Sequence, residues 1–331
     1  MAQHSYFDVA LIKEASRHSP GVPPVADHII EAHRESARLA EAAFSAKQQA
    51  AIEQAERVLY ALNVYNGFAP PSQPILAAIW ANLTSARRRS LLVDVVGTPT
   101  LSFRAMSKIL ESAIEETDHR DHRVLEELDE RGLVLYAKNW YTSTHGFEEQ
   151  LISTLHRASR QVRQMLYANL GDELGADAVP HVELRAWTLQ NFDVAYDPDD
   201  AGVLGEGSAF SDPDTFTEAF ALSNARTVFS QMPDPAYALG CFYTIEACFP
   251  SVCRRILALL RRRGITENAL YYWALHGEAD EHHSAEWLHS LEAARFGDDV
   301  HARIAQGALS HLQERHGLFQ ALPAHARLLS V

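Results

Sequence analysis

The stretch YYWALHGEADEHH, residues 271–283, joins an apolar opening to three histidines and three carboxylates. On an α-helix each residue advances about 100°, so with His276 at 0° Asp280 falls near about 40° and His283 near about −20°. These three side chains therefore share one narrow face. The other polar residues fall on different faces: Glu278, Glu281 and His282.

The same face continues as an apolar stripe, with Tyr272 before the three polar residues and Trp287 after them. A charged group inside such a stripe is costly unless it is paired or binds a metal. Histidine and aspartate together suit a first-row transition metal. The alternative is a solvated helix, because EADEHHSAE, residues 278–286, is polar on nearly every side.

Composition limits the class of protein. The chain has 331 residues, 47% of them hydrophobic, which suffices for one large domain or a core domain with an appendage. The net charge of −14 disfavours nucleic acid and anionic membranes as partners. No apolar run approaches the roughly 18 residues of a membrane span, and no signal peptide is evident, so we expect a cytoplasmic protein. Three clustered cysteines predict neither a disulfide framework nor a Cys-x2-Cys zinc pair.

Helical patterns dominate the chain and predict an all-α protein. Apolar residues recur at spacings of three and four, and no stretch alternates as a strand would. Breaks rich in proline and glycine fall at 66–74 and 96–102. From 134 to about 170 the pattern is continuous and predicts one long helix. We therefore expect a helical extension at 1–133 and a helical core domain at 134–331.

Two further segments offer partners for the stretch at 271–283. Glu246 is a lone acid in the apolar helix YALGCFYTIEACFP, residues 237–250, and Pro250 cannot donate the helical hydrogen bond to its carbonyl. Glu173 and His181 flank a break in which Gly175 and Pro180 permit a bend. The alternatives are an arginine partner for Glu246 and ordinary surface roles for the other pair.

The segment IEETDHRDHRVLEELDERG, residues 114–132, carries Glu-x2-His spacings that are also found in di-iron proteins. It is charged on nearly every face, so we interpret it as a solvated helix. The residues set aside are Glu115, Glu116, His119 and His122.

Taken together, these motifs resemble the haem-oxygenase-like di-iron oxidases and oxygenases, a family of iron-containing redox enzymes. The resemblance covers 134–331 and implies an all-α, haem-oxygenase-like seven-helix bundle, here with an N-terminal helical extension. It also implies two iron ions that react with O2. The ligands it implies are Glu173, His181, Glu246, His276, Asp280 and His283.

Some amine-oxygenating members of that family have an extra carboxylate, and HGFEEQL, residues 145–151, offers Glu148, with Glu149 as the second choice. Plain surface acids are the alternative. This N-oxygenase-like branch implies oxidation of a small-molecule amine or amino acid with an external electron donor, and a homodimer formed through 1–133. A desaturase or C–C-cleaving oxidase of an amino acid or fatty acid is the second hypothesis. A non-enzymatic helical interaction protein is the third.

Overall fold

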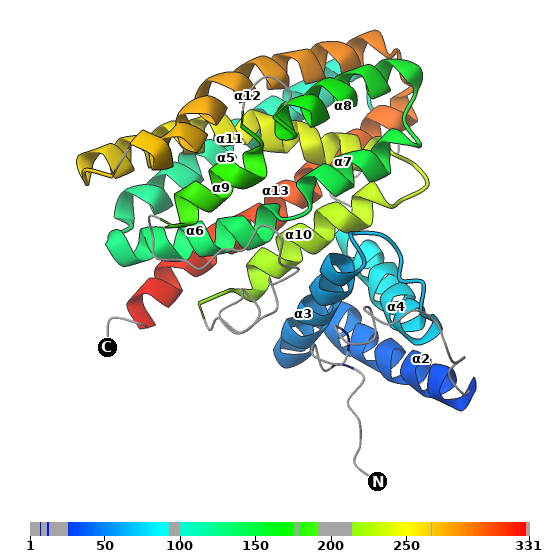
Figure 1. The fold of residues 1–331 in the computed structure, drawn as a ribbon. Coiled ribbons are helices and arrows are strands. Elements are labelled where there is room, and N and C mark those ends of the chain that lie inside the picture. Colours follow the sequence, from blue (N-terminus) through cyan, green and yellow to red (C-terminus); the bar gives the residue numbers. More distant parts are fainter. Residues whose placement is uncertain are drawn as a thin grey trace.

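The computed structural model describes residues 7, 12, 26–92, 100–175, 179–190, 214–265 and 267–328, and all regular structure in these ranges is helical (Figure 1). The all-α prediction is confirmed. Among the described helices, none combines the length and apolar character that crossing a membrane requires. The helices are α2 (Ala26–Ala40), the π-helix η1 (Glu41–Ser45), α3 (Gln49–Tyr65), α4 (Pro74–Leu91), α5 (Phe103–Glu127), α6 (Glu130–Thr144), α7 (Phe147–Leu155), α8 (Arg160–Glu173), α9 (His181–Gln190), α10 (Thr217–Ser230), α11 (Ala236–Arg262), α12 (Glu267–Ala293) and α13 (Asp298–Leu328).

The first helices, α2, η1, α3 and α4, pack around a hydrophobic core of their own beside the larger bundle (Figure 1). Leu59, Leu62 and Leu83 are fully buried in it, and Phe220 of α10 completes it from the bundle side. The N-terminal helices are therefore fixed to the bundle through α10.

A buried polar seam accompanies this contact. Asn63 donates to Asn224 of α10 over 2.9 Å, and Asn224 donates to Glu56 Oε2 over 2.9 Å. Arg87 Nε lies 2.8 Å from Glu56 Oε1, and Arg87 Nη2 lies 2.7 Å from Glu314 Oε2 of α13. A buried charge must be paired to be tolerated, and here each partner comes from a different helix.

The bundle is organised around α11, which packs against α12, α13 and α5. The predicted extension at 1–133 includes α5, and this helix lies along α11 and α13 (Figure 1). Helices α11 and α13 meet backbone to backbone at two glycines. A Cβ at Gly240 would lie 1.9 Å from the carbonyl oxygen of Ile304, and one at Gly307 would lie 2.1 Å from that of Tyr237.

One expectation about the helices was wrong. The single helix predicted from 134 to about 170 is divided into most of α6, then α7 and α8. Gly146, with φ of 77°, separates the first two, and Ser159 caps the start of α8 through Val162 N–H. The apolar spacing continues across both breaks because all three helices turn buried residues toward the core, so periodicity alone did not reveal them.

Candidate metal centre

The six predicted ligands converge from four helices into two neighbouring groups of three. Glu173, His181 and His276 form what we call the His-rich group, and Glu246, Asp280 and His283 form the carboxylate-rich group. Within each group every residue offers a ligand atom within 4.8 Å of the others. Glu173 is the last residue of α8 and His181 the first of α9, Glu246 lies mid-way along α11, and the remaining three lie on α12.

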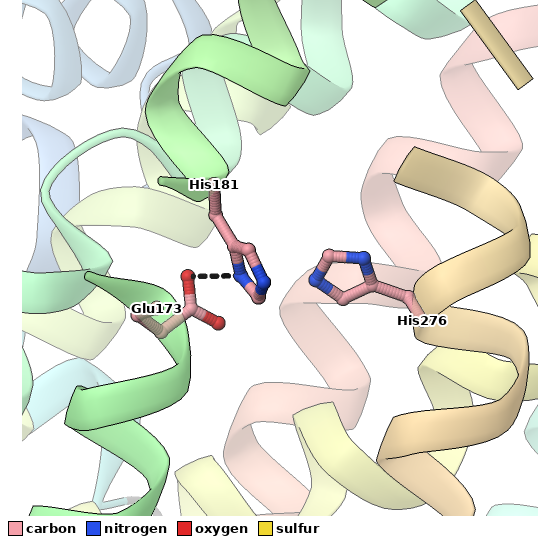
Figure 2. A group of neighbouring side chains, drawn as sticks. All are labelled: Glu173, His181 and His276. Carbon is pink, nitrogen blue, oxygen red and sulfur yellow. Dashed lines mark ion pairs between the residues drawn. The ribbon is translucent and has the colours of Figure 1, made fainter. Parts of the chain in front are cut away.

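The His-rich group is formed where α8 ends, α9 begins and both face α12 (Figure 2). His181 Nδ1 lies 2.9 Å from Glu173 Oε2, and its ring centroid lies 4.4 Å from that of His276. The bend between the two short helices uses Gly175, whose φ is 73° and whose Cβ would meet Pro180 N at 2.5 Å. The predicted bend therefore exists, and it brings Glu173 and His181 together.

His276 is held in one orientation. Its Nδ1 lies 2.8 Å from the carbonyl oxygen of Tyr272, one turn earlier on α12. A carbonyl oxygen only accepts, so Nδ1 carries the proton and Nε2 keeps its lone pair. A fixed tautomer with a free ring nitrogen is what a metal-binding histidine needs.

The carboxylate-rich group lies about one turn farther along α12. His283 Nδ1 is 3.4 Å from Glu246 Oε2 and 3.8 Å from Asp280 Oδ1. Its Nε2 lies 2.8 Å from Asp172 Oδ2, and Asn169 Nδ2 donates to Glu246 Oε1 over 2.9 Å. Asp172 and Asn169 thus orient two of the candidate ligands. Sequence reasoning missed both, although they precede Glu173 on α8.

Burial and mutual charge perturb these groups strongly. Burial would raise the pKa of Glu173, but its interactions with His181, Arg185 and His276 together outweigh this effect and the pKa falls to about 2. Burial, reinforced by Glu246, raises the pKa of Asp280 well above its usual range. Burial, together with the neighbouring charge of His181, lowers the pKa of His276 to about 3. Clustered buried acids of this kind are relieved by a cation.

The donor set fits bound iron. His181 Nδ1 and His283 Nδ1 are both buried, and neither makes an aligned hydrogen bond to any residue that the structure describes. Each nonetheless lies near a carboxylate oxygen, so these atoms converge as ligands do instead of pairing as donor and acceptor. Mixed imidazole and carboxylate ligands suit first-row transition metals, iron among them.

The further carboxylate predicted at Glu148 lies outside both groups. Glu148 forms an ion pair with Arg185 of α9, whose Nη1 also donates to the carbonyl oxygen of Thr144 over 3.2 Å. Glu149 is exposed. No sequence pattern indicated Arg185, since its partner lies on a different helix.

The acids and histidines of α5 and α12 that we did not assign as ligands lie mostly at the surface, where described. Glu115 and His119 have exposed side chains 3.8 Å apart. Glu116 is also exposed, and His122 is partly buried. On α12, His282 is exposed and contacts Glu286. The side chains of Glu278 and Glu281 lie outside the described residues.

A cavity of about 60 Å³ adjoins both groups, which is room for several water molecules. Four of the candidate ligands line it: Glu173, Glu246, His276 and Asp280. Aromatic side chains form much of the remaining wall: Tyr136, Trp140, Phe147, Phe249, Tyr272 and Phe319. Arg185, Arg226, His311 and Arg315 add a second polar set. The metal groups therefore border a partly open cavity with many aromatic side chains in its wall.

Comparison with known proteins identifies the family and the fold of the chain. A family model described as "Iron-containing redox enzyme" matches residues 134–316, more than half of the chain. The 4-aminobenzoate synthase of Chlamydia pneumoniae is 27% identical over 194 residues, covering 56% of this chain and 80% of that protein. A domain of unknown function with a haem-oxygenase-like fold from Shewanella denitrificans superposes with a TM-score of 0.52 at 12% identity, covering 69% of this chain and 92% of that one. Because the identity to the Shewanella denitrificans domain is low, that match shows the fold alone.

Proposed function

Because this chain belongs to the iron-containing redox enzyme family and has a haem-oxygenase-like fold, we propose that it is a non-haem di-iron oxygenase that uses O2 to oxidise the amine of an amino-acid-like or other small metabolite. The observation that carries the proposal is the pair of ligand groups beside one cavity. Two groups of three donors are the arrangement that two adjacent ions require.

In this proposal, two Fe(II) ions supply the electrons and the Lewis acidity that activate O2. Glu173, His181 and His276 would hold one ion, and the carboxylate-rich group the other. The chain's own contribution is orientation. The Tyr272 carbonyl fixes His276, Asp172 fixes His283, and Asn169 fixes one oxygen of Glu246. The aromatic wall limits access of water to the reacting groups.

The relative from Chlamydia pneumoniae, whose name identifies an amine as its product, supports a small nitrogen-containing molecule at the site, and oxidation at the nitrogen is our proposal. Conversion of an amine to a hydroxylamine consumes O2, two electrons and two protons and releases water. We propose that an external donor supplies those electrons. Glu148 is the proposed further carboxylate, and to serve as one it must exchange its ion pair with Arg185.

The test is to load the protein anaerobically with Fe(II), admit O2 and screen small amines for those that increase O2 consumption. We expect a product that has gained an oxygen atom, and ¹⁸O2 should label it. A product that has only lost hydrogen, or carbon, would instead support a desaturase or C–C-cleaving oxidase. Absence of bound iron would support the non-enzymatic alternative.

Matched variants make the screen specific. His276→Ala should abolish amine-dependent O2 consumption, because it removes a candidate ligand. His282→Ala changes a neighbouring histidine on the same helix whose side chain is exposed, and it should leave consumption unchanged. Equal activity in all three proteins would contradict the assignment of the site.

A further inference from the structure

We infer that Arg226 and Arg315 form an anion subsite in the cavity and bind the carboxylate of the substrate, so that the substrates are small amino carboxylates. This inference rests on the proposed function, because it takes the cavity beside the metal groups as the substrate site. It adds the residues that would select an amino carboxylate, which neither the ligand groups nor the name of the relative from Chlamydia pneumoniae specifies.

Arg226 differs from the other buried arginines that the structure describes. Arg87 contacts Glu56 and Glu314, Arg185 contacts Glu148, and Arg315 contacts Asp121. Arg226 is 3% exposed, and in the described part of the chain it forms no ion pair with a carboxylate. A buried guanidinium without a counter-charge is costly, so this position calls for an anion from outside the chain.

The hydrogen bonds of Arg226 leave one side of its guanidinium available. Nε donates to Gln150 Oε1 over 3.0 Å, and Gln150 in turn donates to Thr227. Nη2 is buried and has no hydrogen-bond partner among residues 26–92, 100–175, 179–190, 214–265 and 267–328. Burial lowers the pKa of Arg226 to about 10, which still leaves the group charged at neutral pH. The charge of Glu148 acts on Arg226 from a distance, but Glu148 forms its ion pair with Arg185.

Arg315 supplies a second donor in the lining of the same cavity. Its Nε lies 2.8 Å from Asp121 Oδ2, and its guanidinium lies 5.0 Å from the centroid of the Phe319 ring. Its Nη2 is also buried without a partner in the described ranges. His311 lines the wall as well, and burial together with the two arginines lowers its pKa well below its usual range. His311 is therefore neutral and does not add a third positive charge to the two arginines.

The arginines and the candidate metal ligands of the cavity would together fix the orientation of a bound substrate. Arg226 and Arg315 come from α10 and α13, whereas the four candidate ligands that line the cavity come from α8, α11 and α12. A carboxylate bound by the arginines leaves the rest of a small molecule between aromatic side chains, with its amine free to approach the metal groups. Guanidinium donors recognise carboxylates well because their geometries match.

Benzoate and benzamide test this, since they share an aromatic ring and differ in charge. Isothermal titration calorimetry on the anaerobic Fe(II)-loaded protein should show benzoate binding at least about tenfold more tightly than benzamide, the range expected for hydrogen bonds to a charged group. Arg226→Gln should remove that preference and leave benzamide affinity unchanged. Arg226→Lys, which keeps the charge and loses the planar fork, should retain part of it.

Control variants determine whether the preference for benzoate depends on Arg226 itself. Arg87→Gln changes a buried arginine outside the cavity and should retain the preference. Wild-type protein without any preference for benzoate would overturn the inference, even if Arg226→Gln failed to fold. A preference lost in His276→Ala and retained in Arg226→Gln would also overturn it, because the carboxylate would then bind at the metal groups.

Iron content measured in the same samples distinguishes the two proposals. Protein that binds two irons and shows no benzoate preference would refute the subsite alone. Protein that binds no iron and still loses its benzoate preference in Arg226→Gln would support the subsite and refute the proposed di-iron function.

Discussion

Replacing His276 by alanine should lower the bound iron from two ions per chain to about one. The change removes one of three donors from the His-rich group and leaves Glu173 and His181. The carboxylate-rich group keeps all of its donors. His283→Ala should produce the converse loss, again leaving about one ion, and the double variant should bind none.

The expected magnitude follows from this division into two groups. Removing a residue that only orients a ligand already weakens metal binding by about 10–100-fold, and loss of a ligand should cost more. The affected group should therefore release its ion during desalting. The intact group should retain its ion, since none of its three members is changed.

The assay is iron content per chain after anaerobic loading with Fe(II) and desalting, measured by mass spectrometry and by a colorimetric chelator. His282→Ala and His119→Ala are the controls, because both side chains are largely exposed, and each should retain two ions. If His276→Ala retained both ions, or if it lost both while His283→Ala lost one, the division into two independent groups would be refuted.

Three further predictions concern stability. Gly240→Ala should destabilise the protein by about 3 kcal/mol, because the added Cβ would meet the α13 backbone. Gly171→Ala is the control: a Cβ there meets no atom within 4 Å, so the change should be neutral or stabilising by about 0.5–1 kcal/mol. Thermal unfolding of the two variants measures the difference. Arg87→Met should lower the free energy of unfolding, measured in urea, by about 3–5 kcal/mol, because it leaves the buried Glu56 without a counter-charge. A loss below about 1 kcal/mol would contradict this reasoning. Burial lowers the pKa of His145 from 6.5 to about 4, so the unfolded chain binds more protons between these values and stability falls as the pH falls through them. That loss, up to about 3 kcal/mol, should be absent from the curve of stability against pH measured for His145→Gln.

Four of the six candidate ligands could be proposed from local signals in the sequence, whereas Glu173 and His181, which lie on two helices, were implied mainly by the family resemblance. Helical periodicity determines that His276, Asp280 and His283 share a face. The cost of burying a charge singles out Glu246 within an apolar helix. Each inference needs only the residues of one helix, and the structure brings all of these side chains together.

What the sequence could not provide depends on packing between helices. The division of the ligands into two groups follows from how α8 and α9 meet α12, and no spacing in the chain encodes that arrangement. The contacts of Asp172 with His283 and of Arg185 with Glu148 likewise join residues on different helices. The packing of α5 along α11 and α13 was unforeseen for the same reason, since an amphipathic pattern predicts a buried face without naming what covers it.

The polar seam between the N-terminal helices and the bundle has an evolutionary consequence. A descendant that lost residues 26–92 would expose Asn224 and leave Glu314 without Arg87. Such a lineage would be expected to acquire compensating substitutions at both positions, so the two segments should be inherited together. Among related sequences, the identities at positions 56, 63 and 87 should therefore vary in step with those at 224 and 314. A recombinant that combined the N-terminal helices of one relative with the bundle of another would have to match all five positions.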